Sequence, residues 1–221
     1  LGFWVSGPEG GLYVMPLDTG VARRVVRAPG VQVHGLGGGH YSWSPDMRWI
    51  AYEARGDRLS QNIWVVPADG GEPTNVTRLY AHHGTPAWSP DGKYLLFDSD
   101  RDGRGLYVLP LKWEDVRTTD TDLKYEKPEG QVTVEIEFKD IHRRIRRLTN
   151  QAPQGDLVVA PDGSIYFLSD GDVWSVGWDG KEAKRLTSGG GKSGFRISPD
   201  GKNVAIGLTN GMLEVWSIET R

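Results

Sequence analysis

Four histidines of the chain could bring imidazole groups together at one place. His34, His40, His82 and His83 each stand shortly before an apolar segment that we expect to form a β-strand. Clustered imidazoles can bind zinc, or they can contact a carboxylate of a bound peptide. No His-x-x-x-His spacing is present, so a set of solvent-facing loop histidines is the alternative. Lys192 occupies the comparable place later in the chain, and these five residues are our predicted binding site at the mouth of a channel.

Asp98 opens a stretch that resembles the first half of a calcium-binding loop, Asp-Ser-Asp-Arg-Asp-Gly. Carboxylates at alternate positions, here Asp98, Asp100 and Asp102, can surround a hard cation, and a glycine then permits the sharp turn. The last position of such a loop needs a bidentate glutamate, and this chain has Leu109 there. A tight turn between two strands explains the same residues. We therefore predict a hairpin here, with no metal and no other cofactor.

A basic cluster holds four arginines within five residues, namely Arg143, Arg144, Arg146 and Arg147. Such a cluster can bind an anionic partner or nucleic acid. Isoleucine and leucine alternate with these arginines, however, and acidic residues lie just upstream, which favours an outer strand whose charges pair with its neighbours. The formal net charge of the chain is −3, so we expect no nucleic-acid partner.

These candidate residues sit on a sequence repeat that recurs four times. The first two copies are 45 residues apart and the last two are 38 apart, close to the roughly 40–50 residues of a propeller blade. After each copy come short runs rich in Val, Ile, Tyr and Trp, bounded by Gly, Asp and Pro, as in strands rather than helices. The copies are Trp43-Ser44-Pro45-Asp46, Trp88-Ser89-Pro90-Asp91, Ala160-Pro161-Asp162 and Ser198-Pro199-Asp200.

The repeat predicts an all-β fold, a β-propeller built of four-stranded antiparallel blades. We expect about five blades in a single propeller region, three of them complete and the first and last partial. Because the chain opens with a second strand and closes with a third, we expect part of a larger ring, or a five-bladed ring with irregular ends. Open blade edges also permit self-association. The expected blades are 1–28, 41–77, 84–149 with an insertion at 112–139, 154–187 and 193–221.

The composition excludes several classes of protein. The chain of 221 residues contains no cysteine, so disulfides and thiolate chemistry are ruled out. No apolar run approaches the roughly 20 residues of a membrane-spanning helix, and we expect no membrane partner. No signal peptide is visible, yet the sequence opens at Leu1 without methionine, so a cytoplasmic and a periplasmic location in a bacterium both stay open.

Two segments carry a resemblance to known families. Residues 88–103 resemble the blade of TolB-type propellers, which also occurs in tricorn-like proteases. Residues 134–149 resemble a segment that interrupts one blade of tricorn-like proteases before its outer strand, although Glu137 stands where that pattern usually has aspartate. The resemblance implies a propeller from a tricorn-like protease or a close multidomain relative, whose catalytic residues lie in a separate peptidase domain.

The function that the resemblance implies is docking rather than catalysis. The Gly-x-Ser-x-Gly turn of serine hydrolases is absent, so we expect no enzymatic activity, and a self-contained hydrolase ranks last. The first hypothesis is a propeller that gates or docks peptide substrate for the peptidase domain of its parent protein, through a narrow axial channel. The second is a TolB-type module that binds a protein partner through loops on one face. The insertion is either a mobile surface loop or a contact to other domains of the parent chain.

Overall fold

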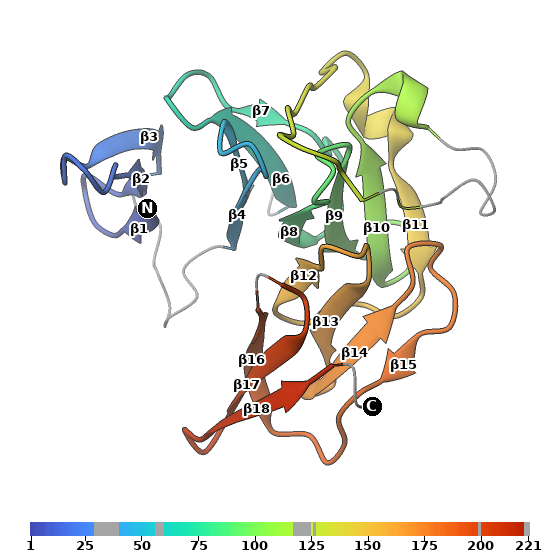
Figure 1. Ribbon diagram of the computed structural model, residues 1–221. Coiled ribbons are helices and arrows are strands. Elements are labelled where there is room, and N and C mark those ends of the chain that lie inside the picture. The colour runs from blue at the N-terminus through green and yellow to red at the C-terminus, as the bar shows by residue number, and fades with distance from the viewer. Residues whose placement is uncertain (29–39, 56–59, 117–124, 126, 199, 219–221) are drawn as a thin grey trace.

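The computed structural model describes residues 1–28, 40–55, 60–116, 125, 127–198 and 200–218. Its strands form five separate antiparallel sheets that fan out around a common centre (Figure 1). Blade 1 contains β1 (Gly2–Val5), β2 (Gly11–Val14) and β3 (Arg23–Arg27). Blade 2 contains β4 (Tyr41–Trp43), β5 (Trp49–Arg55), β6 (Gln61–Pro67) and β7 (Thr74–Asn75).

The remaining three sheets follow the same order along the chain. Within each sheet, consecutive strands are neighbours, and the five sheets do not close into a ring. This architecture confirms the predicted all-β propeller with three four-stranded and two three-stranded blades. Blade 3 contains β8 (His83–Trp88), β9 (Tyr94–Ser99), β10 (Gly105–Pro110) and β11 (Arg146–Thr149). Blade 4 contains β12 (Leu157–Val159), β13 (Ile165–Ser169), β14 (Asp172–Val176) and β15 (Lys184–Arg185), and blade 5 contains β16 (Lys192–Ile197), β17 (Asn203–Leu208) and β18 (Leu213–Ser217).

The Pro-Asp repeat forms the turn that joins the innermost strand of a blade to the second strand. In blade 2, the hydroxyl of Ser44 donates a hydrogen bond to Asp46, which also accepts the N–H of Arg48 at 3.1 Å. Each turn thus satisfies its own polar groups, which explains why the motif recurs. In blade 4 the turn is one residue shorter and has alanine in place of the serine. The same pair of bonds forms at Ser89, Asp91 and Lys93 of blade 3 and at Ser198, Asp200 and Lys202 of blade 5.

Four hydrophobic clusters bury the faces of neighbouring blades against one another. Between blades 2 and 3, the rings of Phe97 and Tyr107 stack with their centroids 6.3 Å apart. The repeat tryptophan Trp88 joins this cluster, and its indole N–H donates to the carbonyl of Ser42 in the preceding blade at 3.1 Å. Each fully buried apolar side chain contributes about 1.5–3 kcal/mol, so the contact between blades is the main source of stability.

The insertion between β10 and β11 begins at η2 (Trp113–Asp115) and ends at η4 (Ile141–Arg144). We call its described central part, Tyr125 and residues 127–138, the strap. The strap contacts blade 2, because the N–H of its residue Val134 donates a hydrogen bond to Oδ2 of Asp46 in the Pro-Asp turn of that blade at 2.8 Å. No helix of the described residues is long and apolar enough to span a membrane.

The strap also covers the Pro-Asp turns of blades 3 and 4. A Cβ atom on Gly92 would lie only 2.8 Å from the side chains of Val132 and Val134. A Cβ atom on Gly163 would lie 2.3 Å from the ring of Tyr125. The described part of the insertion is therefore packed against its own blades, and whether the insertion also contacts another domain stays a prediction.

Asp46 allows the contribution of the strap to stability to be measured. We expect Asp46→Ala to lower the free energy of unfolding by about 1 kcal/mol more than Asp200→Ala does. Both substitutions remove the same bonds within a Pro-Asp turn, but only Asp46 also accepts the N–H of Val134. Urea denaturation followed by tryptophan fluorescence measures both variants. Equal losses would show that the hydrogen bond between Asp46 and Val134 adds nothing to stability.

Candidate functional site

The innermost strands β4, β8, β12 and β16 all begin at the same end of the propeller, which we call the mouth end. The Pro-Asp turns and the strap lie at the opposite end, the turn end. Strand β8 packs against both β4 and β12. His40 directly precedes β4, His82 and His83 lie at the start of β8, and Lys192 begins β16. His34 lies outside the described residues.

His82 belongs to a polar cluster with two carboxylates from neighbouring blades. Glu53 lies on β5 of blade 2, and Asp98 lies on β9 of blade 3. Nε2 of His82 is 3.9 Å from Oδ2 of Asp98, and the hydroxyl of Thr85 donates to Oδ1 of Asp98 at 2.7 Å. The N–H of Thr85 points to Oε2 of Glu53 at 3.4 Å. We call Glu53, His82, Thr85 and Asp98 the mouth cluster.

Gly84 lets these side chains approach the backbone closely. A Cβ atom here would lie 2.8 Å from Oδ1 of Asp98, 3.0 Å from Oε2 of Glu53 and 3.5 Å from Nε2 of His82. The backbone of Gly84 is not in the left-handed region, so this glycine is needed for room rather than for conformation. Three polar atoms from two blades therefore pack closely against the backbone of Gly84.

Burial raises the pKa of Asp98 above its ordinary value. The hydrogen bond from Thr85 and positive charge on His82 or His40 lower this pKa, while the nearby carboxylate of Glu53 adds to the increase. The side chain of Asp98 is 11% exposed and that of His82 is 54% exposed, so solvent reaches the cluster from the side of His82. The neighbouring carboxylate of Glu53 thus favours the protonated form of Asp98.

His83 does not share the environment of His82. Adjacent residues of a strand face opposite sides, and His83 is fully buried with its ring 5.6 Å from that of Phe97. Neither of its ring nitrogens has a hydrogen-bond partner in the protein. Burial lowers the pKa of His83 to about 4, although Asp100 acts in the opposite direction. The imidazole is therefore neutral at pH 7 and out of reach of a ligand.

Lys192 lies at the mouth end, but its side chain is engaged in a buried ion pair. Its Nζ lies 3.0 Å from Oδ1 of the fully buried Asp172, and its side chain is 9% exposed. The same carboxylate binds Arg185 and accepts the hydroxyl of Thr187 at 2.6 Å and the N–H of Gly190 at 3.1 Å. Burial alone would raise the pKa of Asp172, but these partners hold it well below its usual range.

The three aspartates of the calcium candidate bind three different partners. Asp98 belongs to the mouth cluster, and Oδ1 of Asp100 accepts the N–H of His82 at 2.8 Å. Asp102 is exposed and lies 3.4 Å from Arg101. Gly103 has a φ of +97° and closes the hairpin between β9 and β10. Among the residues that the structure describes, no three His, Asp or Glu side chains are arranged to hold a metal ion.

The arginines of the basic cluster contact other residues of the protein around β11. Arg144 is buried, and its guanidinium lies 5.4 Å from the ring centroid of Trp113 and 3.9 Å from Glu137. Arg146 opens strand β11, in keeping with the predicted outer strand. The other two arginines bind different neighbours, Arg147 the carbonyl of Asp102 at 2.9 Å and Arg143 the carboxylate of Asp140 at 3.9 Å.

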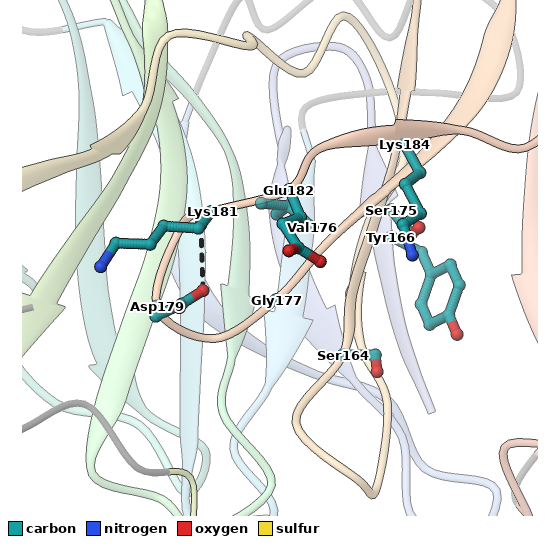
Figure 2. A pocket seen from close by; sticks show the side chains of 9 residues that line it. All are labelled: Ser164, Tyr166, Ser175, Val176, Gly177, Asp179, Lys181, Glu182 and Lys184. Carbon is teal, nitrogen blue, oxygen red and sulfur yellow. Dashed lines mark hydrogen bonds between the residues drawn. The ribbon is translucent and has the colours of Figure 1, made fainter. Parts of the chain in front are cut away.

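A pocket of about 340 Å³ on blade 4 was not predicted from the sequence (Figure 2). Ser175 in its lining pairs with Tyr166 and Lys184, at the register position that the larger Val108 occupies in blade 3. Figure 2 shows the two lysines of the lining extending in different directions, so they do not converge on one ligand group. The lining residues are Ser164, Tyr166, Ser175, Val176, Gly177, Asp179, Lys181, Glu182 and Lys184.

Comparison with known proteins agrees with the architecture. No known family model matches the chain. A stretch of 62 residues is 37% identical to the Tol-Pal system protein TolB of Alcanivorax borkumensis, and covers 28% of this chain and 14% of that protein. The chain superimposes on TolB from Acinetobacter baumannii with a TM-score of 0.64. The repeats of this chain thus resemble those of TolB-type propellers. A further 93 residues are 28% identical to an uncharacterized protein of Agrobacterium fabrum, and cover 42% of this chain and 29% of that protein.

The fold of the chain is also similar to part of a larger protein of known structure. The chain superimposes on the tricorn protease with a TM-score of 0.69 and 16% identity, against 19% identity for TolB from Acinetobacter baumannii. It matches over 96% and 98% of its own length, but spans only 24% of the tricorn protease and 52% of that TolB. The resemblance predicted from the sequence is confirmed. Such likeness establishes the fold, while function has to be argued from the site.

Proposed function

We propose that this chain is a non-catalytic docking propeller that holds an extended segment of a protein or peptide at its mouth end. The observation that carries the proposal is the difference between the two ends. At the turn end, the strap packs against the Pro-Asp turns of blades 2, 3 and 4. At the mouth end, His82 is exposed beside two carboxylates that come from two blades, on a rigid scaffold of the kind that carries binding sites.

The strap favours docking over passage through an axial channel. At the turn end the strap contacts the Pro-Asp turns of three blades, so these turns are already occupied by the chain itself. A segment bound at the mouth end would not compete with the strap. Similarity to the tricorn protease supports a peptide docked beside a peptidase domain, and similarity to TolB supports a protein partner.

Selection from a random peptide phage library tests the docking proposal. Because the chain has no cysteine, a single cysteine can carry a bulky maleimide label at either end. We expect a label at His82→Cys to abolish binding of the selected peptides, and a label at Glu114→Cys, in η2 of the turn end, to leave binding unchanged. Peptides that are blocked only by the Glu114 label would overturn the proposal.

We also expect the isolated chain to hydrolyse no peptide. Buried His83 is held neutral without a hydrogen-bond partner in the protein, and His82 faces a carboxylate rather than a nucleophile. A panel of fluorogenic peptides incubated with the purified chain provides the measurement. Turnover that rises in proportion to the concentration of the chain would contradict the expectation.

A further inference from the structure

Basic side chains gather at the outer rim of the seam between blades 2 and 3. Arg78 lies just after β7, the outermost strand of blade 2, while His142 and Arg143 belong to η4, which precedes the outermost strand of blade 3, β11. The two segments meet through their apolar neighbours, because Val76 and Ile141 are buried in the same hydrophobic cluster between these blades. The fold therefore brings basic residues from two blades to one place.

Arg101, in the hairpin between β9 and β10, adds a further positive charge. Burial lowers the pKa of His142. The charges of Arg78, Arg143 and Arg101 lower this pKa further, and the carboxylate of Asp140 raises it. The electrostatic potential at the imidazole is thus set by three guanidinium groups against one carboxylate. We call Arg78, Arg101, His142 and Arg143 the basic rim.

The nearby carboxylates neutralise the basic rim only in part. Nε of Arg101 lies 3.4 Å from Oδ2 of Asp102, whose side chain is largely exposed. Nε of Arg143 lies 3.9 Å from Oδ1 of Asp140, and both of these side chains are exposed to solvent. Exposed ion pairs are weak and are easily exchanged for another partner. A ligand with its own carboxylates can therefore compete for these arginines.

Several nitrogen atoms of the basic rim lack an acceptor. Arg78 is exposed and, among the described residues, pairs with no carboxylate, because its Nε donates to the carbonyl of Asn75 at 3.1 Å. This bond fixes the planar guanidinium and leaves its two terminal nitrogens for a ligand. Below the surface, neither Nη1 of Arg101 nor Nδ1 of His142 has a hydrogen-bond partner among the described residues. The protein thus leaves positive charge here that its own groups do not neutralise.

The basic rim adjoins the mouth end, where the proposed docking takes place. Arg78 and His82 lie in one connection, between β7 and β8, and Tyr80 between them is 71% exposed. Arg101 is next to Asp100, which accepts the N–H of His82 at 2.8 Å. Tyrosine and arginine are enriched among the residues that dominate binding at protein interfaces. A segment that contacts His82 can therefore continue over Tyr80 to the basic rim.

We propose that the basic rim binds acidic side chains of the docked segment, so that the partner is a polypeptide with an acidic stretch. This inference rests on the proposed docking function. Carboxylates form charge-assisted and often bidentate hydrogen bonds with guanidinium groups, and complementary charge also suppresses wrong partners. A nucleic acid fits less well, because the net charge of the chain is −3 and nucleic-acid-binding proteins present a basic stripe.

Titration with an acetylated and amidated hexaglutamate peptide tests the basic rim on the whole chain. Binding is followed by NMR through the Hε1 resonance of His142 at pH 7, with hexaglutamine and oligothymidylate as comparison ligands. We expect a saturable shift with hexaglutamate that weakens about tenfold when salt is raised from about 0.02 to 0.3 M, and no shift with hexaglutamine. An equal response to hexaglutamine, tighter binding of oligothymidylate, or no response at all would overturn the inference.

Substitutions show whether the arginines bind the probe. We expect Arg78→Gln and Arg143→Gln each to weaken hexaglutamate binding about threefold, and the double variant about tenfold. Arg27→Gln removes an exposed arginine from β3 of blade 1 and should leave binding unchanged. All three side chains are exposed, and circular dichroism checks that each variant is folded. A loss caused equally by Arg27→Gln, or full binding by the double variant, would contradict the assignment.

Peptides from the phage selection separate this inference from the docking function. We expect replacement of every glutamate and aspartate in a selected peptide by the matching amide to weaken docking about tenfold. If the neutral peptide docks unchanged and is still blocked by the label at His82→Cys, the docking function stands and the acidic partner is excluded. If hexaglutamate binds at the basic rim but no selected peptide is blocked by that label, the basic rim stands and the docking function fails.

Discussion

Lowering the pH from 7 to 4 is expected to reduce the stability of the folded chain by about 3 kcal/mol through His83 alone. Burial lowers the pKa of His83 from 6.5 to about 4, so the unfolded chain takes up the proton first. The contribution is complete above about pH 6.5 and is lost as the pH falls towards 4. Below pH 4, His83 is protonated in both the folded and the unfolded chain, so the loss of stability does not increase further.

The variant His83→Phe isolates this effect. The aromatic ring keeps the contact with Phe97 and cannot be protonated. Other groups titrate in the same range, and the raised pKa of Asp98 acts in the opposite direction, so the difference between the two proteins is the quantity to measure. Urea denaturation at half-unit intervals between pH 4 and 7.5 gives both curves. Parallel curves would show that His83 is not buried and neutral.

Replacing Asp172 by asparagine is expected to lower the free energy of unfolding by about 3 kcal/mol at pH 7, because the substitution leaves a buried cation without its partner. Lys192 is almost fully buried beside this carboxylate, whereas Arg185 is half exposed, which places the effect at the lower end of the usual range. The pKa of Asp172 is lowered in the folded state, so its contribution is present above the ordinary pKa of aspartate and is lost in stronger acid.

Asp156→Asn is the matched control for this prediction. Asp156 also pairs with an arginine and accepts a backbone N–H, that of Phe195 at 2.8 Å, but Arg196 is largely exposed. We expect a loss of about 1 kcal/mol for this variant. Chemical denaturation at pH 7 measures both. A smaller loss for Asp172→Asn than for Asp156→Asn would contradict the arrangement around Lys192.

Most of the fold could be predicted from the repeat, because the turn that joins the first two strands of a blade is closed by hydrogen bonds within that repeat. Ser44 and Asp46 close their turn with bonds inside one repeat, so a short motif was enough to place the strands on either side. The path of the strap could not be derived in this way. Asp46 and Val134 are 88 residues apart in sequence, and only the arrangement of blades in space brings them together.

The mouth site was harder to predict because it depends on neighbouring blades. His82 and His83 look equivalent in sequence, yet strand alternation sends one to the surface and the other into the core. Glu53 was not identified, although a signal exists: it lies ten residues after Trp43, as Asp98 lies ten residues after Trp88. Residues at the same position of two consecutive repeats lie at corresponding places in neighbouring blades, so the two carboxylates come close together.

Hydrogen exchange measured with and without a selected peptide tests the central claim most directly. The claim is that the partner docks at the mouth end while the strap occupies the turn end. We predict slower exchange of backbone amides at the starts of β4 and β8 and in the hairpin after Asp98, with no change in the strap or the Pro-Asp turns. Protection confined to residues 127–138 and the turns around Asp46 and Gly92 would contradict the account.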